Sequence, residues 1–554
     1  MRILGILSHH DSSVCLIEDG KLLRFYKEER LARVKREFPP IKCLTEIYNE
    51  FGDTIDYFVG EYNDTCKALQ ERFFPSVKDW LDIDHHQQHA SLAFYDSGFK
   101  DAIAVIVDRN GQKAPGVCES ESVYHCSYPD NIIPVYKCYN KDWYGRYCNS
   151  EVFKIDINSI VSRQSQKYPD CHFAIESYYN ICAVYESAIA LINEHPMEAG
   201  KVMGLASYGK SFPTSRLIGS DSIPIDSNFH TRHRFDIKWG SNTKGNHPYT
   251  INRELDSKST KTITPDNYQL YADYSHQVQC ETQQALGDLI ERYAHLSDNI
   301  CISGGYGMNV VANQYLTERF PFKSFFFEPL ADDSGNSVGS ALMLHYEITG
   351  SMEPFDFKDT MCHGKEYPIP KEYKTCELDF IVDSLCNDKS VAVFHKQAEA
   401  GPRALGNRSI LFNPYNPDAK EIVNKIKRRE WYRPFAAIVL DYEAPYLFNI
   451  GKHEIDERNC KYMTRSVTVR DPFLYGVTHV DQTCRIQTID YKHHLYRLLR
   501  SISSNIGYGV LLNTSFNLAG EPLVETLADA EKTYYNSDLD ILWFPETNQF
   551  ISKD

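Results

Sequence analysis

The run AEAGPRALGNRSI, from Ala398 to Ile410, and the basic segment KRREWYRPF, from Lys427 to Phe435, decide how the C-terminal part of this chain folds and binds. Both gather arginines, and the first surrounds them with glycines. Glycine lets backbone N–H groups approach a ligand closely, and an arginine side chain can pair with two phosphate oxygens at once. A basic helix exposed to solvent is the simpler interpretation of such charge. Arg403 and Arg433 each adjoin a proline, where helical surface charge is unusual, so we interpret these two as ligands of a small, multiply charged anion.

The length and composition of the chain limit the possible classes of protein. A chain of 554 residues is too long for one hydrophobic core and should form two domains or more. The formal net charge of −16 argues against a general nucleic-acid binder, although it permits a local basic groove. No stretch approaches the roughly 18 apolar residues of a membrane span. Sixteen cysteines without a secretory signal indicate reduced thiols, so we expect a cytoplasmic protein that does not enter a membrane.

The best domain boundary lies between residues 350 and 375, where Pro354, Gly364, Pro368 and Pro370 interrupt every periodic pattern. We therefore predict a large domain over residues 1–355 and a smaller one over residues 375–554. The basic motifs fall in the smaller domain.

The large domain alternates strands and helices. Apolar runs predict buried strands at Ile3–Leu7, at 102–108 and at 299–305, and VCLIEDGKLLRFY (14–26) predicts a hairpin turning at Asp19 and Gly20. Apolar residues at helical spacing between Leu286 and Leu296 predict a helix before the last of these strands. This pattern indicates an α/β fold with ligand chemistry at the ends of the strands.

Polar motifs follow three of the predicted strands. SHHDSS (8–13) and DRNG (108–111) are equally typical of simple turns. SGGYGMN (303–309) is more informative, because paired glycines before a helix expose backbone N–H groups that can hold nucleotide phosphates. We therefore expect Gly304, Gly305 and Asn309 to contact a nucleotide. EPLADDSGNSVGSA, from Glu328, forms a second such turn.

The segment DHHQQHA (84–90) is a candidate metal site. His85 and His89 lie one helical turn apart and can share an ion, with Asp333 as the candidate third ligand. Such a set suits iron(II) or zinc. The glutamate of the H-E-x-x-H pattern is absent, so peptide hydrolysis is not supported. A purely structural histidine pair is the alternative, and His86 is then an exposed neighbour.

The motifs together resemble one family. HDSSVCLIEDGKLLRFYKEERLARVK, DHHQQHA, AGKVMGLASYG, SGGYGMNVVAN, DDSGNSVGSA, GPRALGNRSI, REWYRPF, HVDQTCRIQT and NTSFN occur in the order found in the nodulation- and tobramycin-type O-carbamoyltransferases. The resemblance covers nearly the whole chain. It implies an N-terminal domain of the actin and sugar-kinase type, joined to a smaller YrdC-like α/β domain.

The resemblance also implies the reaction and its residues. Members use carbamoyl phosphate and ATP to form carbamoyl-adenylate and transfer the carbamoyl group to an acceptor hydroxyl. Iron(II), or zinc in its place, is the implied metal, and Mg²⁺ is a further candidate cofactor. In the smaller domain the residues implied to bind carbamoyl phosphate or nucleotide are Lys427, Arg433, Arg485 and Ser515, with Arg403 and Asn513 close by. In the larger domain the implied contacts of carbamoyl-adenylate are His10, Lys35 and Asp108, and the implied metal ligands are His85, His89 and Asp333.

The general base and the acceptor stay open at this point. His10 is our candidate base, with Asp11 and Glu198 as alternatives. Arg109, Gln112 and Asp332 depart from the usual family pattern, which leaves acceptor recognition undecided.

The acceptor is either a small hydroxylated metabolite, such as a sugar, antibiotic or toxin, or 5-hydroxymethylcytosine in phage DNA. The basic and aromatic segment 231–247 fits a nucleotide or phosphate backbone, although an exposed insertion loop is the favoured interpretation. The remaining alternatives for the function are a kinase of the same architecture and a noncatalytic binding protein. A homodimer is a possible oligomeric state.

Overall fold

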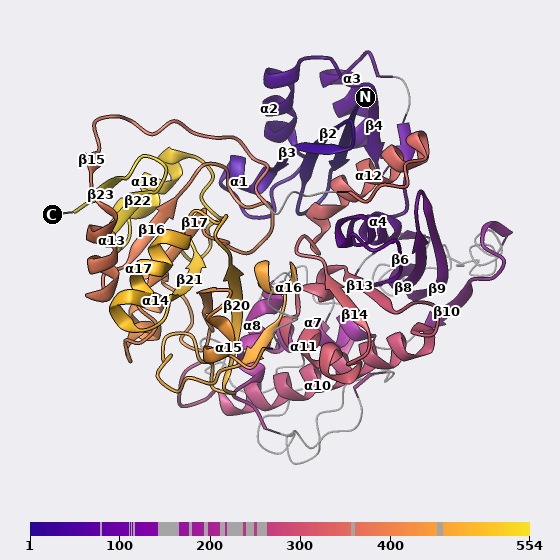
Figure 1. The fold of residues 1–554 in the computed structure, drawn as a ribbon. Helices are drawn as coiled ribbons and strands as arrows, with labels where there is room; N and C mark the ends of the chain where they lie inside the picture. The colour runs from indigo at the N-terminus through magenta and orange to yellow at the C-terminus, as the bar shows by residue number, and fades with distance from the viewer. Residues whose placement is uncertain are drawn as a thin grey trace. The chain divides into compact units, whose positions relative to one another are not determined.

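The computed structural model describes residues 1–61, 63–77, 80–109, 111, 113–114, 117–141, 166–176, 180–192, 198–210, 217–218, 237–239, 249–251, 263–355, 361–450 and 458–553 (Figure 1). Contacts within the chain divide it into two compact units. The first comprises Met1–Ile83 and Phe327–Asp554, and the second comprises Asp84–Phe326. The N-terminal residues therefore share a unit with the C-terminal part of the chain.

The first unit begins with a five-stranded sheet of order β3-β2-β1-β4-β5. Its strands are β1 (Arg2–Leu7), β2 (Ser13–Glu18), β3 (Lys21–Lys27), β4 (Tyr57–Gly60) and β5 (Trp80–Asp82), and its helices are α1 (Glu28–Ala32), α2 (Ile41–Phe51) and α3 (Asp64–Phe73). β1, β2 and β3 pair antiparallel, whereas β4 and β5 extend the sheet in parallel. Asp19 and Gly20 turn between β2 and β3 with φ of 48° and 75°, the left-handed conformation that a two-residue hairpin needs. The predicted first strand and hairpin are confirmed.

Helix α12 (Asn336–Thr349) packs on β1, β2 and β4. The approach is so close that a Cβ atom on Gly5 would lie 1.9 Å from the carbonyl oxygen of Ser337. Only glycine fits here, and this contact fixes the turn that precedes α12, η3 (Asp333–Gly335), against the first strand.

The second unit is built on a seven-stranded sheet of order β10-β9-β8-β6-β13-β14, with β7 paired to β8. Its strands are β6 (Asp101–Val107), β7 (Lys113–Ala114), β8 (Val117–Ser127), β9 (Asn131–Lys141), β10 (His172–Glu176), β13 (Asn299–Ser303) and β14 (Ser324–Phe327). Its helices are α4 (His85–Ser97), α7 (Ile181–Leu191), α8 (Ala199–Ala206), α10 (Gln269–Tyr293), η2 (Gly305–Met308) and α11 (Val310–Arg319), and β11 (Ile237–Trp239) and β12 (Tyr249–Ile251) form a separate hairpin. The two predicted buried strands, β6 and β13, are parallel neighbours, and α10 precedes β13 as expected. Their polar ends therefore meet at one edge of the sheet.

The C-terminal part of the first unit carries a nine-stranded sheet of order β15-β23-β22-β16-β17-β21-β18-β20-β19. Its strands are β15 (Lys374–Thr375), β16 (Val391–Phe394), β17 (Arg408–Phe412), β18 (Ala436–Leu440), β19 (Ser466–Thr468), β20 (Thr483–Ile489), β21 (Val510–Ser515), β22 (Ile541–Phe544) and β23 (Gln549–Ser552). The helices beside it are α13 (Leu378–Cys386), α14 (Ala419–Lys427), α15 (Ala444–Leu447), α16 (Arg458–Lys461), α17 (Tyr496–Ile506) and α18 (Leu527–Tyr535).

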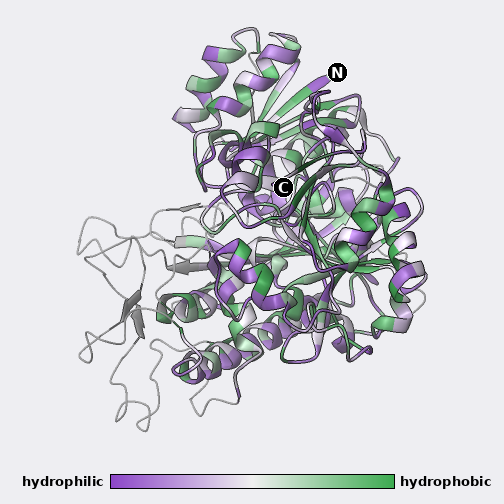
Figure 2. Ribbon diagram, turned by 90° about the vertical axis from the view of Figure 1, so that its left-hand side faces the viewer, coloured by the Kyte–Doolittle hydropathy of each residue, from purple (hydrophilic) through white to green (hydrophobic). Residues whose placement is uncertain are grey.

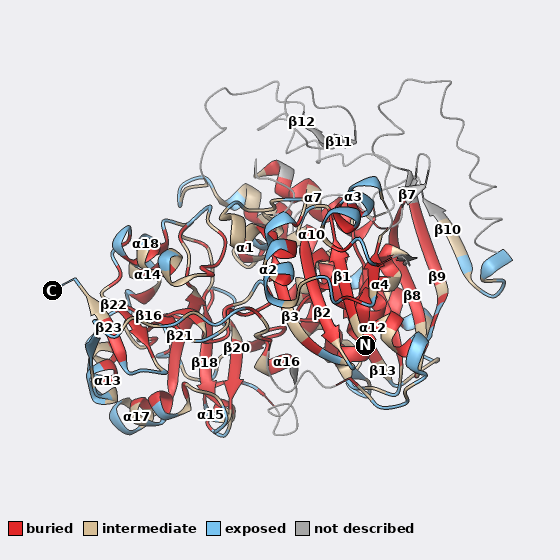
Figure 3. Cartoon of the chain, turned by 90° about the horizontal axis from the view of Figure 1, so that it is seen from above, coloured by how far each residue is buried: buried red, intermediate tan, exposed pale blue. Residues whose placement is uncertain are grey.

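Helices cover both faces of this sheet. The side chains of β18 point alternately into two hydrophobic cores, one on each face of the sheet. Ala437 and Val439 share one core with residues of α14, and Ile438 and Leu440 share the other with residues of α13 and α17. Figure 3 shows the central strands buried, and Figure 2 shows hydrophobic residues along the strands and hydrophilic residues on the outer parts of the helices.

Both units are α/β structures with mixed sheets, as the alternation predicts. The finer assignments, an actin and sugar-kinase type domain and a YrdC-like domain, stay predictions, as does the boundary between residues 355 and 375. Among the described residues no helix is both long enough and apolar enough to cross a membrane.

Candidate functional site

Helix α14 ends at Lys427, whose side chain is buried beside the end of β21. Its three N–H groups are shared among four acceptors, namely Ser515 Oγ at 3.1 Å, Asn517 O at 2.8 Å, Asn517 Oδ1 at 2.9 Å and Ser515 O. These acceptors are all neutral. The lysine is therefore positioned firmly while most of its charge stays uncompensated.

The charge of Arg433 acts on three other predicted anion ligands, Lys427, Arg485 and Arg403. Burial, and then the positive charges of Arg429, Arg433 and Lys35, hold the pKa of the Lys427 ammonium well below its usual range. Burial and the Arg433 charge lower the pKa of Arg485 to about 10. Burial, followed by the charges of Arg485 and Arg433, also holds the pKa of Arg403 well below its usual range. A small, multiply charged anion relieves such repulsion, so this cluster has the electrostatics of a phosphate site.

Two further arginines of the same motifs are held by contacts within the protein. Arg429 donates to Asn424 Oδ1 at 2.6 Å and to the carbonyl of Pro434 at 2.9 Å, and its guanidinium lies 4.1 Å from the ring centroid of Phe435. Arg408 is fully buried, donates to the carbonyls of His395 and Lys396, and lies over the ring of Phe394. The sequence gives no local sign of this difference between Arg408 and Arg403.

A single carboxylate holds the loop that carries Arg403. Oε1 of the buried Glu399 accepts hydrogen bonds from the backbone N–H groups of Leu405 at 2.6 Å, Asn407 at 2.8 Å and Arg408 at 3.1 Å. An ionised acceptor strengthens each of these bonds. Glu399, which the motif analysis did not single out, fixes the backbone of the GPRALGN loop (401–407), which we call the donor loop.

Asn513, a predicted ligand, also supports the donor loop. Its Nδ2 donates to Ala404 O at 3.2 Å and to Gln487 Oε1 at 2.9 Å, while Gln487 donates to Leu405 O at 2.8 Å. The carbonyl side of the loop is thus held from β20 and β21.

The histidines after β1 surround the carboxylate of Asp333 in the first unit. The Nδ1 atoms of His10 and His9 lie 3.4 Å and 3.9 Å from Asp333 Oδ2, and His9 Nε2 lies 3.4 Å from Glu61 Oε2. The next residue, Asp332, forms a buried ion pair with Lys27 at 3.0 Å. This pairing explains how the chain accommodates an additional carboxylate at the turn before α12.

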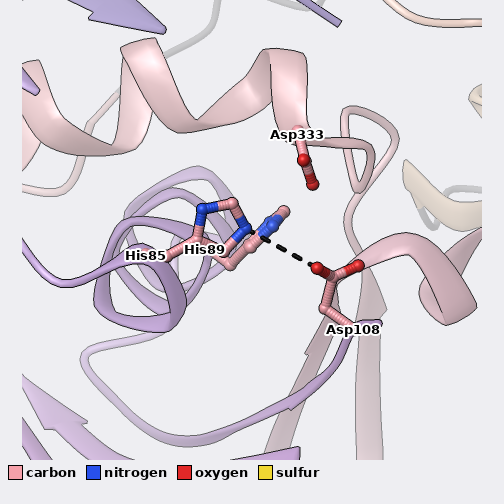
Figure 4. Close-up of side chains that lie close together, drawn as sticks. All are labelled: His85, His89, Asp108 and Asp333. Carbon is pink, nitrogen blue, oxygen red and sulfur yellow. Dashed lines mark ion pairs between the residues drawn. The ribbon is translucent and has the colours of Figure 1, made fainter. Parts of the chain in front are cut away.

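The predicted histidine pair lies at the start of α4 in the second unit (Figure 4). His85 Nε2 is 3.6 Å from Asp108 Oδ2, and one ligand atom each of His85, His89 and Asp108 lies within 4.8 Å of the others. All three residues are buried. Two imidazoles and a carboxylate at this spacing can hold a divalent metal ion. Asp333, the predicted third ligand, belongs to the first unit.

The paired glycines fix the position of Asp108. Gly304 has φ of 85°, and a Cβ atom there would lie 2.5 Å from the carbonyl oxygen of Val107. The N–H of Gly305 donates to Asp108 Oδ1 at 3.0 Å. Asn309 caps α11 by accepting from Ala312 N at 3.1 Å. The turn therefore orients the Asp108 carboxylate beside the histidine pair. The sequence predicted polar groups at the ends of these strands, but not that the glycine turn holds Asp108.

A buried network that the motifs did not reveal supports the start of α4. The cap residue Asp84 accepts from Gln87 N at 3.2 Å and lies 3.3 Å from the Nζ of Lys137, which is 2.8 Å from Glu119 Oε1. The neighbouring His86 is fully buried and contacts Ser122 Oγ at 2.9 Å, so it is not the exposed residue of the alternative interpretation. Lys137 lies in β9, and the pattern of apolar and polar residues in that strand does not indicate a buried lysine.

Several predicted features lie outside the described residues or are engaged elsewhere. Gln112 and most of segment 231–247 lie outside, and only residues 237–239 of that segment are described, as β11. Arg109 pairs with Glu186 at 2.8 Å. Glu198 directly precedes α8, and the pKa of Asp11 is raised by burial.

Comparisons with known proteins agree on one family. The model described as "Carbamoyltransferase N-terminus" matches residues 66–342, and "Carbamoyltransferase C-terminus" matches residues 382–551. Nodulation protein NolO of Bradyrhizobium diazoefficiens is 30% identical over 83% of this chain and 77% of its own length. Nodulation protein NolNO of Sinorhizobium fredii is 24% identical over 96% of this chain and 77% of its own length.

Two further matches are less informative about function. An uncharacterized protein of Methanocaldococcus jannaschii is 28% identical over 100% of this chain and 99% of its own length. The crystal structure of full-length HypF in a phosphate- and nucleotide-bound form covers 63% of this chain and 56% of its own, with 12% identity and a TM-score of 0.36. Similarity at that level supports no inference about the fold or the ligands.

Proposed function

The chain belongs to the carbamoyltransferase family and is a carbamoyltransferase, and we propose that it uses carbamoyl phosphate and ATP to form carbamoyl-adenylate and then carbamoylates a hydroxyl of a small metabolite. The observation that carries this proposal is the cluster of mutually repelling cations around Lys427. Carbamoyl phosphate and ATP both present the concentrated negative charge that such a cluster requires.

The proposed first step is assisted by the cations. Cleavage of the C–O bond between the carbamoyl carbon and the phosphate oxygen, with attack by water, gives carbamate and inorganic phosphate. A carbamate oxygen then attacks the α-phosphorus of ATP, and pyrophosphate leaves. Negative charge grows on phosphate oxygens in both events, so preplaced Lys427, Arg433 and Arg485 lower the barriers. Ser515 and Arg403 complete the binding set in this proposal. The amide of Asn513 positions the donor loop, which carries Arg403.

The proximity of Lys35 to Lys427 supports internal transfer of the intermediate. Lys35 belongs to the N-terminal segment, yet its charge acts on the pKa of Lys427 in the C-terminal part of the same unit. We assign Lys35 to the adenylate phosphate. Water hydrolyses carbamoyl-adenylate. If Lys35 of the transfer site contacts the intermediate while the intermediate is still close to the donor site, its exposure to water and its hydrolysis are limited.

The second step concerns the acceptor hydroxyl. The 3.4 Å contact between His10 Nδ1 and Asp333 orients the imidazole and leaves Nε2 to accept the hydroxyl proton. The hydroxyl oxygen forms a bond to the carbamoyl carbon, and AMP leaves. His10 is the proposed base, ahead of Asp11 and Glu198, because it has a carboxylate partner at this distance.

The donor set of the second unit fits a divalent metal. Two buried imidazoles and Asp108, within 4.8 Å of one another, suit iron(II) or zinc, and we propose Asp333 as a further ligand. When bound, the ion supplies Lewis-acid polarisation of phosphate and carbonyl oxygens. Gly304 and Gly305 hold Asp108 in place for this role, and Asn309 keeps α11 directly behind the same turn.

The proposal is tested with the purified protein, carbamoyl phosphate, ATP and a panel of hydroxylated sugars and antibiotics, followed by mass spectrometry. DNA containing 5-hydroxymethylcytosine is a further member of the panel, although no contact among the described residues favours it. We expect a carbamoylated small molecule and AMP. Phosphorylated acceptor with ADP instead of AMP would identify a kinase and contradict the proposal.

A further inference from the structure

A second group of cations lines an open cavity of about 700 Å³ at the start of α17. Its principal lining residues are Tyr491, Lys492, His493, His494, Arg497 and Arg500. None of the lining residues, all of which are described, is acidic. The volume lies within the range of roughly 300–1,000 Å³ typical of small-molecule sites.

The two arginines of the cavity are available to a ligand. Arg497 and Arg500 are exposed, and neither side chain makes an ion pair or hydrogen bond within the described part of the chain. They lie three residues apart on one helix, where like charges repel. On the α17 side of the cavity the nearest acidic residue in sequence, Asp490, is 3.8 Å from Lys461 and accepts from the N–H of Lys492. Glu377 and Asp379 flank the lining residue Leu378 on the other side, but neither forms an ion pair with the two arginines among the described residues.

The inner wall of the cavity contacts the donor loop. His493 and His494 are stacked with ring centroids 4.5 Å apart, and their Nε2 atoms lie 3.1 Å from Leu405 O and Gly406 O, respectively. A carbonyl oxygen only accepts, so both imidazoles must carry hydrogen on Nε2. The N–H of Leu495 donates to His493 Nδ1 at 3.2 Å, which fixes the neutral tautomer.

The contact leaves little freedom for the loop. Gly406 has φ of 109°, and a Cβ atom there would lie 2.8 Å from the ring of His493. Any displacement of the two imidazoles must therefore move the backbone that carries Arg403, or break the hydrogen bonds to it. The cavity and the donor loop share these two side chains.

We propose that this cavity is a second anion site, for a small phosphate-bearing molecule, and that its occupant acts on the donor loop through His493 and His494. Arg497, Arg500 and Lys492 supply the charge, and the hydroxyl of Ser501 supplies a further donor to phosphate oxygens. Tyr491, which is 74% exposed, offers a ring on which a base can stack. The site is distinct from the Lys427 cluster and makes the enzyme responsive to phosphate compounds. The inference does not depend on the proposed reaction.

Binding stoichiometry tests the site directly. By equilibrium dialysis we expect the wild type to bind one more equivalent of ADP, or of inorganic pyrophosphate, than the double variant Arg497→Ser/Arg500→Ser, and we expect Arg433→Ala to keep the cavity site. The control Lys371→Ser/Lys532→Ser removes the same charge from exposed positions of the same unit and should bind as many equivalents as the wild type. Tighter binding of ADP identifies a nucleotide site, and tighter binding of pyrophosphate identifies a site for free phosphates. Equal numbers of equivalents bound by the double variant and the wild type, or none bound by Arg433→Ala, would overturn the proposal.

Hydrogen exchange tests the coupling without turnover. In Arg433→Ala, saturating pyrophosphate should change the amide exchange rates of residues 401–410 by at least twofold. The same addition to a triple variant that also carries Arg497→Ser/Arg500→Ser should have no effect. Unchanged exchange in Arg433→Ala would refute the action on the donor loop.

Discussion

The partly buried positive charge of Arg485 should destabilise the folded protein when no anion is bound. Burial and the Arg433 charge lower the pKa of Arg485 from its usual range to about 10, which corresponds to about 3 kcal/mol by which the folded protein disfavours the charged guanidinium. Solvent screens part of this, because the side chain is only partly buried, so roughly 1–3 kcal/mol is the expected effect. The Nε atom of Arg485 also has no hydrogen-bond partner among the described residues. Arg485→Met should therefore stabilise the unliganded protein by roughly this amount.

The sign of the pH dependence follows from the direction of the shift. A cation whose pKa is lower in the folded state destabilises the fold at every pH below the folded pKa. The penalty is fully present at neutral pH and is lost only as the pH rises beyond about 10. The difference in stability between variant and wild type should therefore be constant throughout the neutral range.

The assay is urea unfolding of both proteins with and without inorganic phosphate, each in the Arg497→Ser/Arg500→Ser background, which removes the second anion site. Phosphate should stabilise the wild type, by mass action on a site that exists only in the folded state, and should stabilise Arg485→Met much less. The control is Arg408→Met, which removes a buried arginine with hydrogen bonds to two carbonyls and should lose stability instead. A less stable Arg485→Met protein, or one that responds to phosphate like the wild type, would refute the idea of an electrostatically strained anion site.

Three further changes test other parts of the account. Glu399→Gln keeps an acceptor oxygen but removes its charge, which weakens the three hydrogen bonds that hold the donor loop. This variant should raise the KM for carbamoyl phosphate several-fold and the KM for the acceptor less. Equal effects on the two KM values would contradict a role of Glu399 in the donor loop. Gly304→Ala should displace Asp108 and reduce metal content, measured by mass spectrometry of the purified protein, whereas Gly350→Ala, which meets no neighbouring atom, should leave metal content unchanged. Lys137→Met leaves Asp84 and Glu119 without their cation and should lower metal affinity and stability by roughly 3–5 kcal/mol in unfolding free energy; a fully stable, metal-loaded variant would show that the network does not support α4.

Local patterns predicted the elements of the fold well. The apolar runs became β1, β6 and β13, and the Asp19-Gly20 pair became the hairpin turn, because side-chain periodicity and turn chemistry are properties of neighbouring residues. The partners of those elements were harder to predict. Nothing local indicates that residues 1–83 join those after 327, since that depends on contacts such as Gly5 with Ser337, far apart in sequence.

The site was predictable by residue type but not by individual role. Arg403 and Arg408 occur in one motif, yet Arg408 enters the core because β17 begins there, while Arg403 stays in the loop. Glu399 and Lys137 support the two sites through single buried contacts, and such contacts leave no periodic trace in the sequence. Supporting residues of this kind become visible only with a structure.

The most direct test of the central claim is detection of carbamoyl-adenylate by rapid quenching and mass spectrometry, without any acceptor. The account predicts that wild type and His89→Ala form the intermediate from carbamoyl phosphate and ATP, and that Arg433→Ala does not. The exposed neighbour Arg428→Ala serves as the control and should behave as wild type. Formation of the intermediate by Arg433→Ala at the wild-type rate, or its loss in His89→Ala alone, would contradict the assignment of donor activation to the cation cluster.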